Sequence, residues 1–511
     1  MNRQHAASAW NDWSSLGKMM VLIGGLCLVP LTMIPFYPAD SQYLSCFLLP
    51  SALSAILGGA IWIRCSQPAH VPGFCREREN RPAITRRSSL IVLAAWIWAF
   101  VAGALPFILA GLLRPVPALF EAVSGWTTTG LSAMDVAAVP KIFLFHRSFM
   151  QFCGGLGFVM MMVIVTSGTH DIRLFESEGH PDQLMPGLKR TARTVLALFA
   201  GFLAVGTLAL TVCGMSWFDA VNHAMCALST GGFSTRAGSI GEYQSLSIDL
   251  VTIVLMLIGT TNFAVLLLLA KGRIRQILKV TEVRFMTGLL LVAIGLLAWI
   301  LYSQLHLPWQ ESLQKAAFDA VSALSTTGFS SMSYADWPAA AIGLLMVLMV
   351  IGGGMGSTAG GIKLLRICLA SKALRFWTRR QVTDSSEITP VTYVRAQGKT
   401  TASRDLIRSV FGYIGLYLAI LVTGTLLICL ISDLTLTDSF FDFASSLGTV
   451  GLSMGATGPQ TADGVLLVEM AGMLLGRLEI LIVFKGVYSL KEIISQRLRK
   501  PRFPENHCSL L

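Results

Sequence analysis

A short motif of the form T-x-G-[L/F]-S occurs four times in the chain, with copies roughly 100 to 120 residues apart. Its first three positions are Thr128-Thr129-Gly130, Thr230-Gly231-Gly232, Thr326-Thr327-Gly328 and Thr449-Val450-Gly451. Four copies of one unit indicate a fourfold arrangement. Backbone carbonyl oxygens from four such strands can replace the hydration shell of a cation.

The glycine is the position that this chemistry needs most. A strand that turns back at close quarters requires a residue that can leave ordinary φ/ψ space without a side chain in the way. Taken singly, each glycine is also explained as a turn residue. In the same register of four copies, the glycines predict a ring.

Composition places the motif in a membrane protein. The chain has 511 residues, 54% of them apolar and only 13% charged, whereas a soluble domain carries about 25% charged residues. The net charge of +11 comes from cations clustered between apolar segments. That distribution is the positive-inside pattern and excludes a nucleic-acid-binding face.

Ten segments are apolar and long enough to predict membrane spans, which need about 20 residues. They are Met19–Phe36, Tyr43–Ile63, Ser89–Leu113, Ile142–Ser167, Thr194–Met215, Leu246–Ala270, Phe285–Tyr302, Ala339–Ile351 continued by Ile362–Leu369, Ser409–Ile431 and Gly464–Tyr488. Every basic cluster falls on one side, so both termini are predicted to be cytoplasmic. The predicted units are a two-span N-terminal domain (1–87), four repeats (88–193, 194–284, 285–408 and 409–511) and, at the end of the last, a basic tail.

Each repeat contains an apolar segment too short to cross. These segments are Ala118–Trp126, Trp217–Leu228, Leu313–Leu324 and Ser439–Ser446. They connect spans of opposite direction, so they are predicted to dip in from outside as half-helices whose partly negative C-terminal ends point at the membrane centre. Phe-acid pairs near their starts place Glu121, Asp219, Asp319 and Asp442 at the positive helix ends, as dipole partners or as attractants for cations. The alternative is four amphipathic loops on the outer surface.

A glycine tract interrupts the last span of the third repeat. Its glycines are Gly352, Gly353, Gly354, Gly356, Gly360 and Gly361. Irregular backbone at membrane depth is tolerated where it lines a water-filled cavity or is buried in protein. The tract is therefore predicted to form a gate beneath the ring of glycines, which would act as an ion filter. The alternative is a kink that only serves helix packing. The tract nearly matches a phosphate-binding loop, but Lys363 comes one place late and no strand–loop–helix surrounds it.

Charged residues inside spans are functional candidates because their burial in lipid is costly. Arg477 is a candidate for a buried pair with a nearby glutamate, Glu469 or Glu479. Lys363 is either a second pore cation or a side chain that reaches the inner surface. Asn262 is a candidate for hydrogen bonding between helices.

Four stretches carry a family resemblance over nearly the whole chain. They are Arg147–Gly155 (RSFMQFCGG), Ser229–Ser234 (STGGFS), Gly352–Lys363 (GGGMGSTAGGIK) and Gly476–Glu479 (GRLE). They resemble the Trk/Ktr/HKT superfamily of potassium transporters, and the two leading spans are most similar to its bacterial TrkH type.

The resemblance implies an all-α polytopic fold, with two N-terminal helices and four pseudo-symmetric repeats of span, pore helix and span around a central ion pore. It implies K⁺ as the transported ion, bound by the filter carbonyls, and Gly130 implies potassium over sodium. It further implies that the loop 352–361 obstructs the pore, that Arg477 faces it, and that the protein is a homodimer in the bacterial inner membrane with a cytoplasmic nucleotide-binding, TrkA-like regulatory subunit. No organic cofactor is expected.

Two departures from fourfold symmetry are expected. Phe218 and Gly232 are 14 positions apart, against 10 in the other repeats, so the second pore helix is predicted to be about one turn longer. Val450 also replaces a threonine found in two other copies.

Two other functions compete with passive or ion-coupled potassium uptake. The pore subunit of a Kdp-type ATPase shares this ancestry and requires an ATPase partner. A membrane enzyme is disfavoured, because the eight histidines include no HExxH and no Ser/His/acid or Cys/His set falls on one side. Coupling to protons or sodium, as in a symporter, stays open. The basic loops are explained equally well by their effect on the orientation of the chain in the membrane and by binding to anionic lipid.

Overall fold

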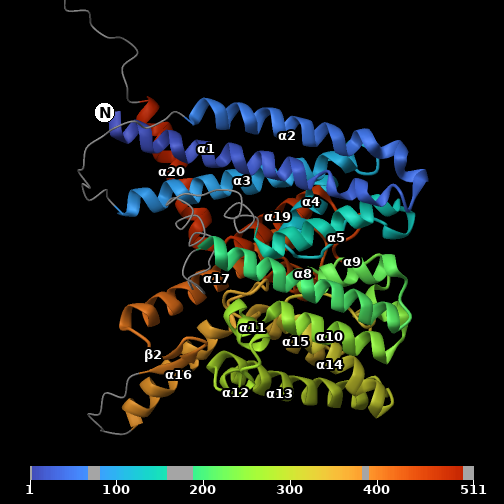
Figure 1. Cartoon of the computed structure of the whole chain (residues 1–511). Coiled ribbons are helices and arrows are strands. Elements are labelled where there is room, and N and C mark those ends of the chain that lie inside the picture. Colours follow the sequence, from blue (N-terminus) through green and yellow to red (C-terminus); the bar gives the residue numbers. More distant parts are fainter. Residues whose placement is uncertain (1–2, 67–80, 158–187, 383–390, 499–511) are drawn as a thin grey trace, which may run out of the picture.

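The computed structural model describes residues 3–66, 81–157, 188–382 and 391–498, and these residues are mostly helical (Figure 1). The all-α polytopic fold is confirmed. Six of the described helices are long and apolar enough to cross a membrane, or seven spans if one bent pair is counted as a span.

The first two long helices form an N-terminal pair. α1 (Arg3–Leu26) and α2 (Leu44–Cys65) run side by side and are joined by the short 3-10 turns Val29–Met33 and Pro38–Tyr43. Their close approach depends on Gly17 and Gly58, because a Cβ on Gly17 would lie 2.6 Å from the Gly58 carbonyl oxygen. Small residues at a crossing let two backbones approach in this way.

The rest of the chain repeats one unit four times: an outer helix, a short pore helix, an extended strand and a return helix. The first repeat has α3 (Arg81–Leu109), α4 (Pro115–Trp126) and α5 (Lys141–Leu156). The second has α8 (Leu188–Val212), α9 (Trp217–Leu228), α10 (Leu246–Thr260), α11 (Phe263–Ala270) and the short α12 (Ile274–Ile277). The third has α13 (Thr281–Gln304), α14 (Trp309–Ser325), α15 (Ala339–Ile351) and α16 (Leu364–Val382). The fourth has α17 (Arg404–Ile431), α18 (Leu436–Gly448), α19 (Asp463–Arg477) and α20 (Ile480–Leu498), and short 3-10 turns lie at Val136–Ala138 and Ser239–Tyr243.

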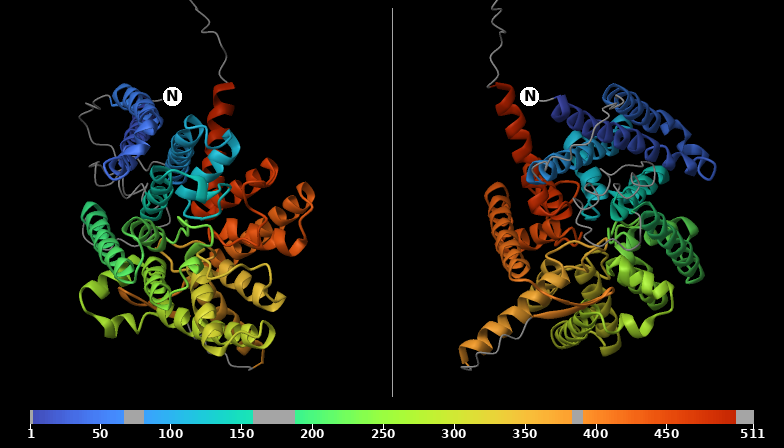
Figure 2. Two further views of the ribbon diagram at one scale, coloured as in Figure 1. Left: turned by 90° about the vertical axis from the view of Figure 1, so that its right-hand side faces the viewer. Right: turned by 60° about the vertical axis from the view of Figure 1, so that its left-hand side comes forward.

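The four repeats surround a common centre. In the left view of Figure 2 the first to fourth repeats, from cyan through green and yellow to red, follow one another around it, with the N-terminal pair outside. The pore helices are packed between the outer and return helices, as α9 is between α8 and α10. Their inner faces are buried, so the strands that follow them start inside the protein.

The prediction of long, unbroken return spans is wrong in two repeats. α10 and α11 meet at a bend of 116°, where the Asn262 side chain accepts a hydrogen bond from Ala264 N and starts a new helix. α19 ends at Arg477, and Glu479, with φ of +53°, separates it from α20. The break expected at Gly352–Gly361 lies between α15 and α16. In the first repeat, α5 ends at Leu156, and the rest of the predicted span Ile142–Ser167 lies outside the described residues.

A small β-hairpin lies between α16 and α17. β1 (Thr392–Arg395) pairs antiparallel with β2 (Gly398–Thr401). It is anchored to neighbouring helices: Val394 N donates to Thr281 Oγ1 at 2.8 Å and Lys372 Nζ donates to the Thr392 carbonyl at 2.9 Å. The hairpin thus joins α13 to α16 on the side of the molecule where the return helices break.

Candidate functional site: a ring of four strands and the loop beneath it

The four motif copies share one backbone conformation. The threonine that opens each copy has a left-handed φ, between +50° and +56°, at Thr128, Thr230, Thr326 and Thr449. The glycine two positions later is again left-handed, with φ of +96°, +74°, +82° and +101° in chain order. A β-branched residue rarely adopts φ above zero, and such strain persists only where the surroundings impose it.

The four strands close into a ring, which we call the filter ring (Thr128–Gly130, Thr230–Gly232, Thr326–Gly328 and Thr449–Gly451). Each glycine packs against the carbonyl oxygen of the residue that precedes the glycine of the next repeat, so closely that an added Cβ would collide with it. The four contacts are Gly130 with Gly231, Gly232 with Thr327, Gly328 with Val450 and Gly451 with Thr129. The last contact returns to the first repeat, so the order around the ring is the order in the chain.

Hydrogen bonds hold each strand to its own pore helix. Gly130 N donates to Ser124 Oγ at 3.0 Å, and Gly451 N donates to Ser445 Oγ at 2.9 Å. In the third repeat Ser322 Oγ donates to the Phe329 carbonyl at 2.6 Å. The amides of Gly130 and Gly451 therefore point toward their own pore helices.

The pore-helix acids were predicted to lie at the helix starts, and for three of them this is wrong. Glu121 lies six residues into α4 and accepts hydrogen bonds from Ser132 Oγ and Ala133 N, both at 2.7 Å. Asp319 and Asp442 bind the chain twelve residues later in the same way, at Ser331 N (3.2 Å) and Met454 N (3.1 Å). These buried carboxylates hold the segment that leaves the filter ring.

The second repeat departs from this pattern, but not by the predicted longer helix. α9 and α4 each have 12 residues, α18 has 13, and the longest pore helix is α14 with 17. The Phe218-Asp219 pair lies one turn earlier on its helix than in the other repeats. His223 takes the place of the acid and lies 2.9 Å from Ser234 Oγ, while Asp219, in the first turn, accepts from Thr235 Oγ1 at 2.6 Å.

Two side chains of α5 support the first and second strands. Arg147, only 2% exposed, donates through Nε to Glu121 at 2.8 Å and lies 3.9 Å above the Phe233 ring. Gln151 donates to the Gly231 carbonyl at 2.5 Å and accepts from Phe233 N at 3.1 Å. Neither residue was predicted to have a role, although a charged residue in an apolar span is a signal for one.

A cavity of about 1300 Å³ lies on one side of the filter ring. All four ring glycines line it, together with the segments that follow them in the chain. We call it the vestibule. The vestibule opens to the ring on the side on which the pore helices begin.

The glycine tract 352–361 lies against the opposite side of the ring. Thr358 Oγ1 lies 3.0 Å from Thr230 Oγ1, and Gly360 N donates to Thr326 Oγ1 at 2.7 Å. A Cβ on Gly360 would collide with the Gly448 carbonyl and with Thr449. The tract thus contacts three of the four left-handed threonines.

The tract is a closed loop rather than a kink in a helix. Its two ends, Gly352 and Gly361, both have left-handed φ and pack against each other, and Gly353 N donates to the Gly360 carbonyl at 3.3 Å. Gly354 N donates to the Thr260 carbonyl at 3.0 Å, which ties the loop to the break after α10.

Arg477 completes the contacts on the fourth side. Its guanidinium donates to Thr128 Oγ1 at 3.2 Å, to the Thr358 carbonyl at 2.5 Å and to the Gly154 carbonyl at 2.5 Å. It therefore links the filter ring, the loop and the end of α5. Of the two glutamates predicted as its partners, Glu479 pairs with Arg366 at 2.8 Å and Glu469 accepts from Thr457 Oγ1 at 2.8 Å.

Lys363 lies next to this group. It has φ of +85°, and its ammonium donates to the Ala359 carbonyl, so it folds back onto the loop. Lys363, Arg477 and Glu479 line one small cavity with Gly356 and Gly360.

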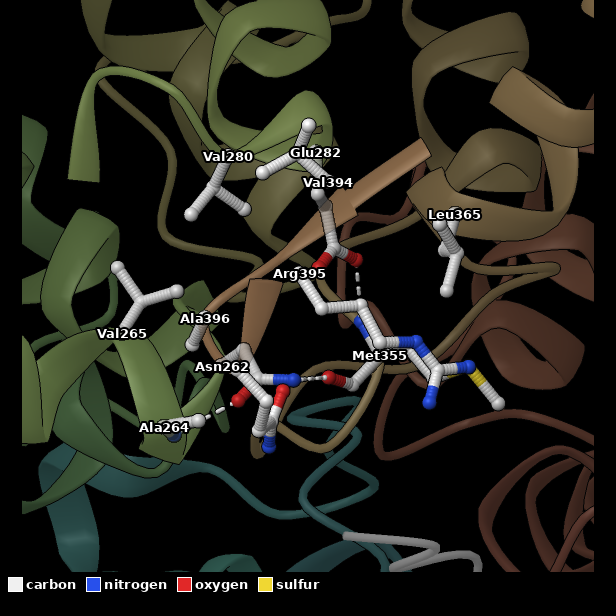
Figure 3. A pocket seen from close by; sticks show the side chains of 11 residues that line it. Asn262, Ala264, Val265, Val280, Glu282, Met355, Leu365, Val394, Arg395 and Ala396 are labelled. Carbon is white, nitrogen blue, oxygen red and sulfur yellow. Dashed lines mark hydrogen bonds between the residues drawn. The ribbon is translucent and has the colours of Figure 1, made fainter. Parts of the chain in front are cut away.

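The far end of the loop is held by three other elements (Figure 3). Met355 N donates to Glu282 Oε1 at 2.6 Å, and Asn262 donates through its amide to the Met355 carbonyl. Val394 and Arg395 of the hairpin line the same pocket. Asn262 was a candidate for hydrogen bonding between helices, but its partner is the loop. The hairpin lies beside the same end of the loop.

This arrangement defines a class of protein. Half-helices that carry extended strands to a common axis, inside a bundle of apolar helices, are the architecture of membrane proteins that pass ions. A sequence model of the family "TrkH: Cation transport protein" matches residues 59–485. The chain belongs to the TrkH cation transport family.

Several relatives are similar over most of their length. The Trk system potassium uptake protein TrkG of Escherichia coli K12 is 29% identical over 482 residues, covering 90% of this chain and 94% of the relative. TrkH of Halomonas elongata is 28% identical over 481 residues, with 91% and 95% covered. The crystal structure of the potassium transporter TrkH from Vibrio parahaemolyticus has the same fold, with a TM-score of 0.78, 24% identity and 95% and 99% coverage. The family resemblance is confirmed, and these comparisons give the Kdp alternative no support.

The Arg147–Glu121 pair is predicted to be a major stabiliser of the site. Arg147→Ala leaves a buried carboxylate without its cation, which costs about 3 to 5 kcal/mol of unfolding free energy. The measurement is unfolding in detergent micelles. Arg114→Ala is the matched control, because the Arg114–Asp463 pair is 71% and 43% exposed and an exposed pair contributes at most about 1 kcal/mol. Equal losses in both variants would contradict the role of Arg147.

Proposed function

We propose that the protein takes up K⁺ across the bacterial inner membrane through the filter ring. The observation that carries this proposal is the closure of four strands of one conformation, with each glycine against the carbonyl of the next repeat. The amides of Gly130 and Gly451 point to their pore helices, and we assign carbonyl oxygens of the four strands as the groups that bind the ion on the axis. Carbonyl oxygens are the ligands that replace the hydration shell of K⁺ in a filter.

Two further features support a cation as the cargo. The pore helices end at the ring, and their C-terminal ends carry partial negative charge. The inward direction of transport has a driving force of about 2.3 kcal/mol per charge for each 100 mV of membrane potential. The named relatives of Escherichia coli and Halomonas are potassium uptake proteins, and glycine at all four ring positions supports potassium over sodium.

The loop 352–361 and Arg477 are proposed to form the gate. The loop contacts the ring threonines through Thr358 and Gly360, and Arg477 adds a positive charge beside Thr128. Both obstruct a cation that leaves the ring. Opening therefore requires the loop to give up its hydrogen bonds to the ring.

Regulation is proposed to act on the gate from the cytoplasmic side. The hairpin and Glu282 hold the far end of the loop at Met355, so a protein bound there can bias the gate without touching the ring. We expect this partner to be a cytoplasmic nucleotide-binding subunit of the TrkA type, acting on a homodimer of the chain with both termini cytoplasmic. The relatives' names describe a "Trk system", in keeping with a transporter of more than one component.

Replacement of a ring glycine tests the filter. Gly232→Ser adds a side chain at φ of +74° against the Thr327 carbonyl, so the ring must deform and the preference for Rb⁺ over Na⁺ is expected to fall. The measurement is the uptake of both ions into proteoliposomes at fixed voltage. Gly201→Ser is the control, because nothing lies within 4 Å of a Cβ there. Unchanged selectivity in Gly232→Ser would exclude the ring as the filter.

Removal of the charge at Arg477 tests the gate. Arg477→Ala removes the four hydrogen bonds that join the ring, the loop and the end of α5. Ion leak through the liposome membrane is therefore expected to rise, as it is on deletion of part of the loop. Arg404→Ala, at the exposed start of α17, controls for loss of an arginine. A folded Arg477→Ala protein with unchanged flux would contradict the gate.

A further inference from the structure

The pore-helix acids Glu121, Asp219, Asp319 and Asp442, which we call the brace acids, differ in the cations that lie beside them. Glu121 pairs with Arg147 at 2.8 Å and Asp219 with Arg236 at 3.1 Å. Next to Asp319, Lys315 donates to the carbonyl of Ser331, at 3.0 Å. Among the described residues, no lysine or arginine forms an ion pair with Asp442, and its neighbour is a second acid, Glu469 of α19.

The two acids meet at one hydroxyl group. Thr457 Oγ1 lies 3.1 Å from Asp442 Oδ2 and 2.8 Å from Glu469 Oε1. Both carboxyls are buried, with 1% of Asp442 and 0% of Glu469 exposed. The other oxygen of Glu469, Oε2, is buried and has no hydrogen-bond partner.

The number of hydrogen-bond donors around the two carboxyl groups indicates that one of them carries a proton. A threonine hydroxyl has one hydrogen and can donate to only one of the two carboxyls. Asp442 also accepts from Ser453 Oγ at 2.8 Å and Met454 N at 3.1 Å, as a carboxylate does. Glu469 has no other donor, and two buried anions that share one site cannot both stay ionised.

The other charged groups on the packed elements do not neutralise the pair. Around α18 and α19, Glu121 is bound to Arg147, Asp463 to Arg114, and Arg477 to the ring and the loop. Asp438 lies at the exposed start of α18, where it interacts with Thr435. α15 contains no charged residue. Arg408, the charged residue of α17 nearest to Asp442 in the sequence, is exposed, and so is Lys485, the charged residue of α20 nearest to Glu469.

We propose that Asp442, Thr457 and Glu469 form a proton-binding site, in which Glu469 donates to Thr457 and Thr457 donates to Asp442. Thr457, Ser453 and Met454 line the vestibule, so water there can exchange the proton. The ligand is a proton from the outer solution.

The site acts on the fourth strand of the filter ring. Ser453 and Met454 lie two and three residues after Gly451, and Asp442 binds both. Loss of the proton puts a second negative charge beside Asp442, and the repulsion loosens the segment that it holds. The consequence rests on the proposed function: ion uptake falls when the external solution becomes alkaline.

Infrared spectroscopy tests the site independently of transport. In the whole protein, reconstituted in lipid at neutral pH, the difference spectrum of wild type minus Glu469→Gln is expected to show the C=O stretch of a protonated carboxyl group. The band is expected to disappear as the pH is raised, because the buried carboxyl then loses its proton. Glu311→Gln, at an exposed acid of the first turn of α14, is expected to retain the band.

A transport assay provides a second test of the site. Rb⁺ uptake by wild type and Glu311→Gln is expected to fall over the external pH range in which the band disappears. Uptake by Glu469→Gln, whose amide donates to Thr457 as the protonated acid does, is expected to lose this dependence. Absence of the carboxyl band, or an unchanged pH profile in Glu469→Gln, would overturn the proposal. A band without Rb⁺ uptake in wild type would support the proton site and reject the proposed transport instead.

Discussion

The structure depends on the close approach of four backbone strands, each glycine against the carbonyl of the next repeat. No other residue fits there, because a Cβ would occupy the position of the neighbouring oxygen and the φ values lie in the left-handed region. The ring then fixes what surrounds it. The strained threonines must be supported from outside the ring, and the pore helices, brace acids and α5 side chains provide that support.

The same constraint explains why the return helices are interrupted. Below the ring, α5, α10, α15 and α19 all end, at Leu156, Thr260, Ile351 and Arg477. Unbroken helices would leave no room there for the loop 352–361. Arg477 and Thr358 fill this space and contact the ring and the breaks at once. One interruption was visible as a glycine tract, but its function depends on the other three.

Much of the fold was predictable from the sequence, and the reasons are local. Apolar length marks the outer helices, and four copies of a glycine motif after short segments mark the pore helices. The phase of α9 was not predictable in this way, because Phe218-Asp219 imitates the Phe-acid pair of the other repeats while His223 takes its position. The helix breaks at Asn262 and Glu479 were also not predicted, because a single polar residue does not end a segment that is defined by its apolar length. The roles of Arg147, Gln151 and Glu469 depend on contacts between segments far apart in the chain, which spacing alone does not reveal.

The central claim is that a cation is bound by the carbonyl oxygens of the filter ring. The most direct test is to determine the structure of the protein in Rb⁺ and to map the anomalous scattering of that ion. We predict a peak on the axis, between the carbonyl oxygens of the residues from Thr128 to Gly130 and their three counterparts, which weakens when Na⁺ replaces Rb⁺. An ordered ring with no peak, or with peaks only outside it, would contradict the account.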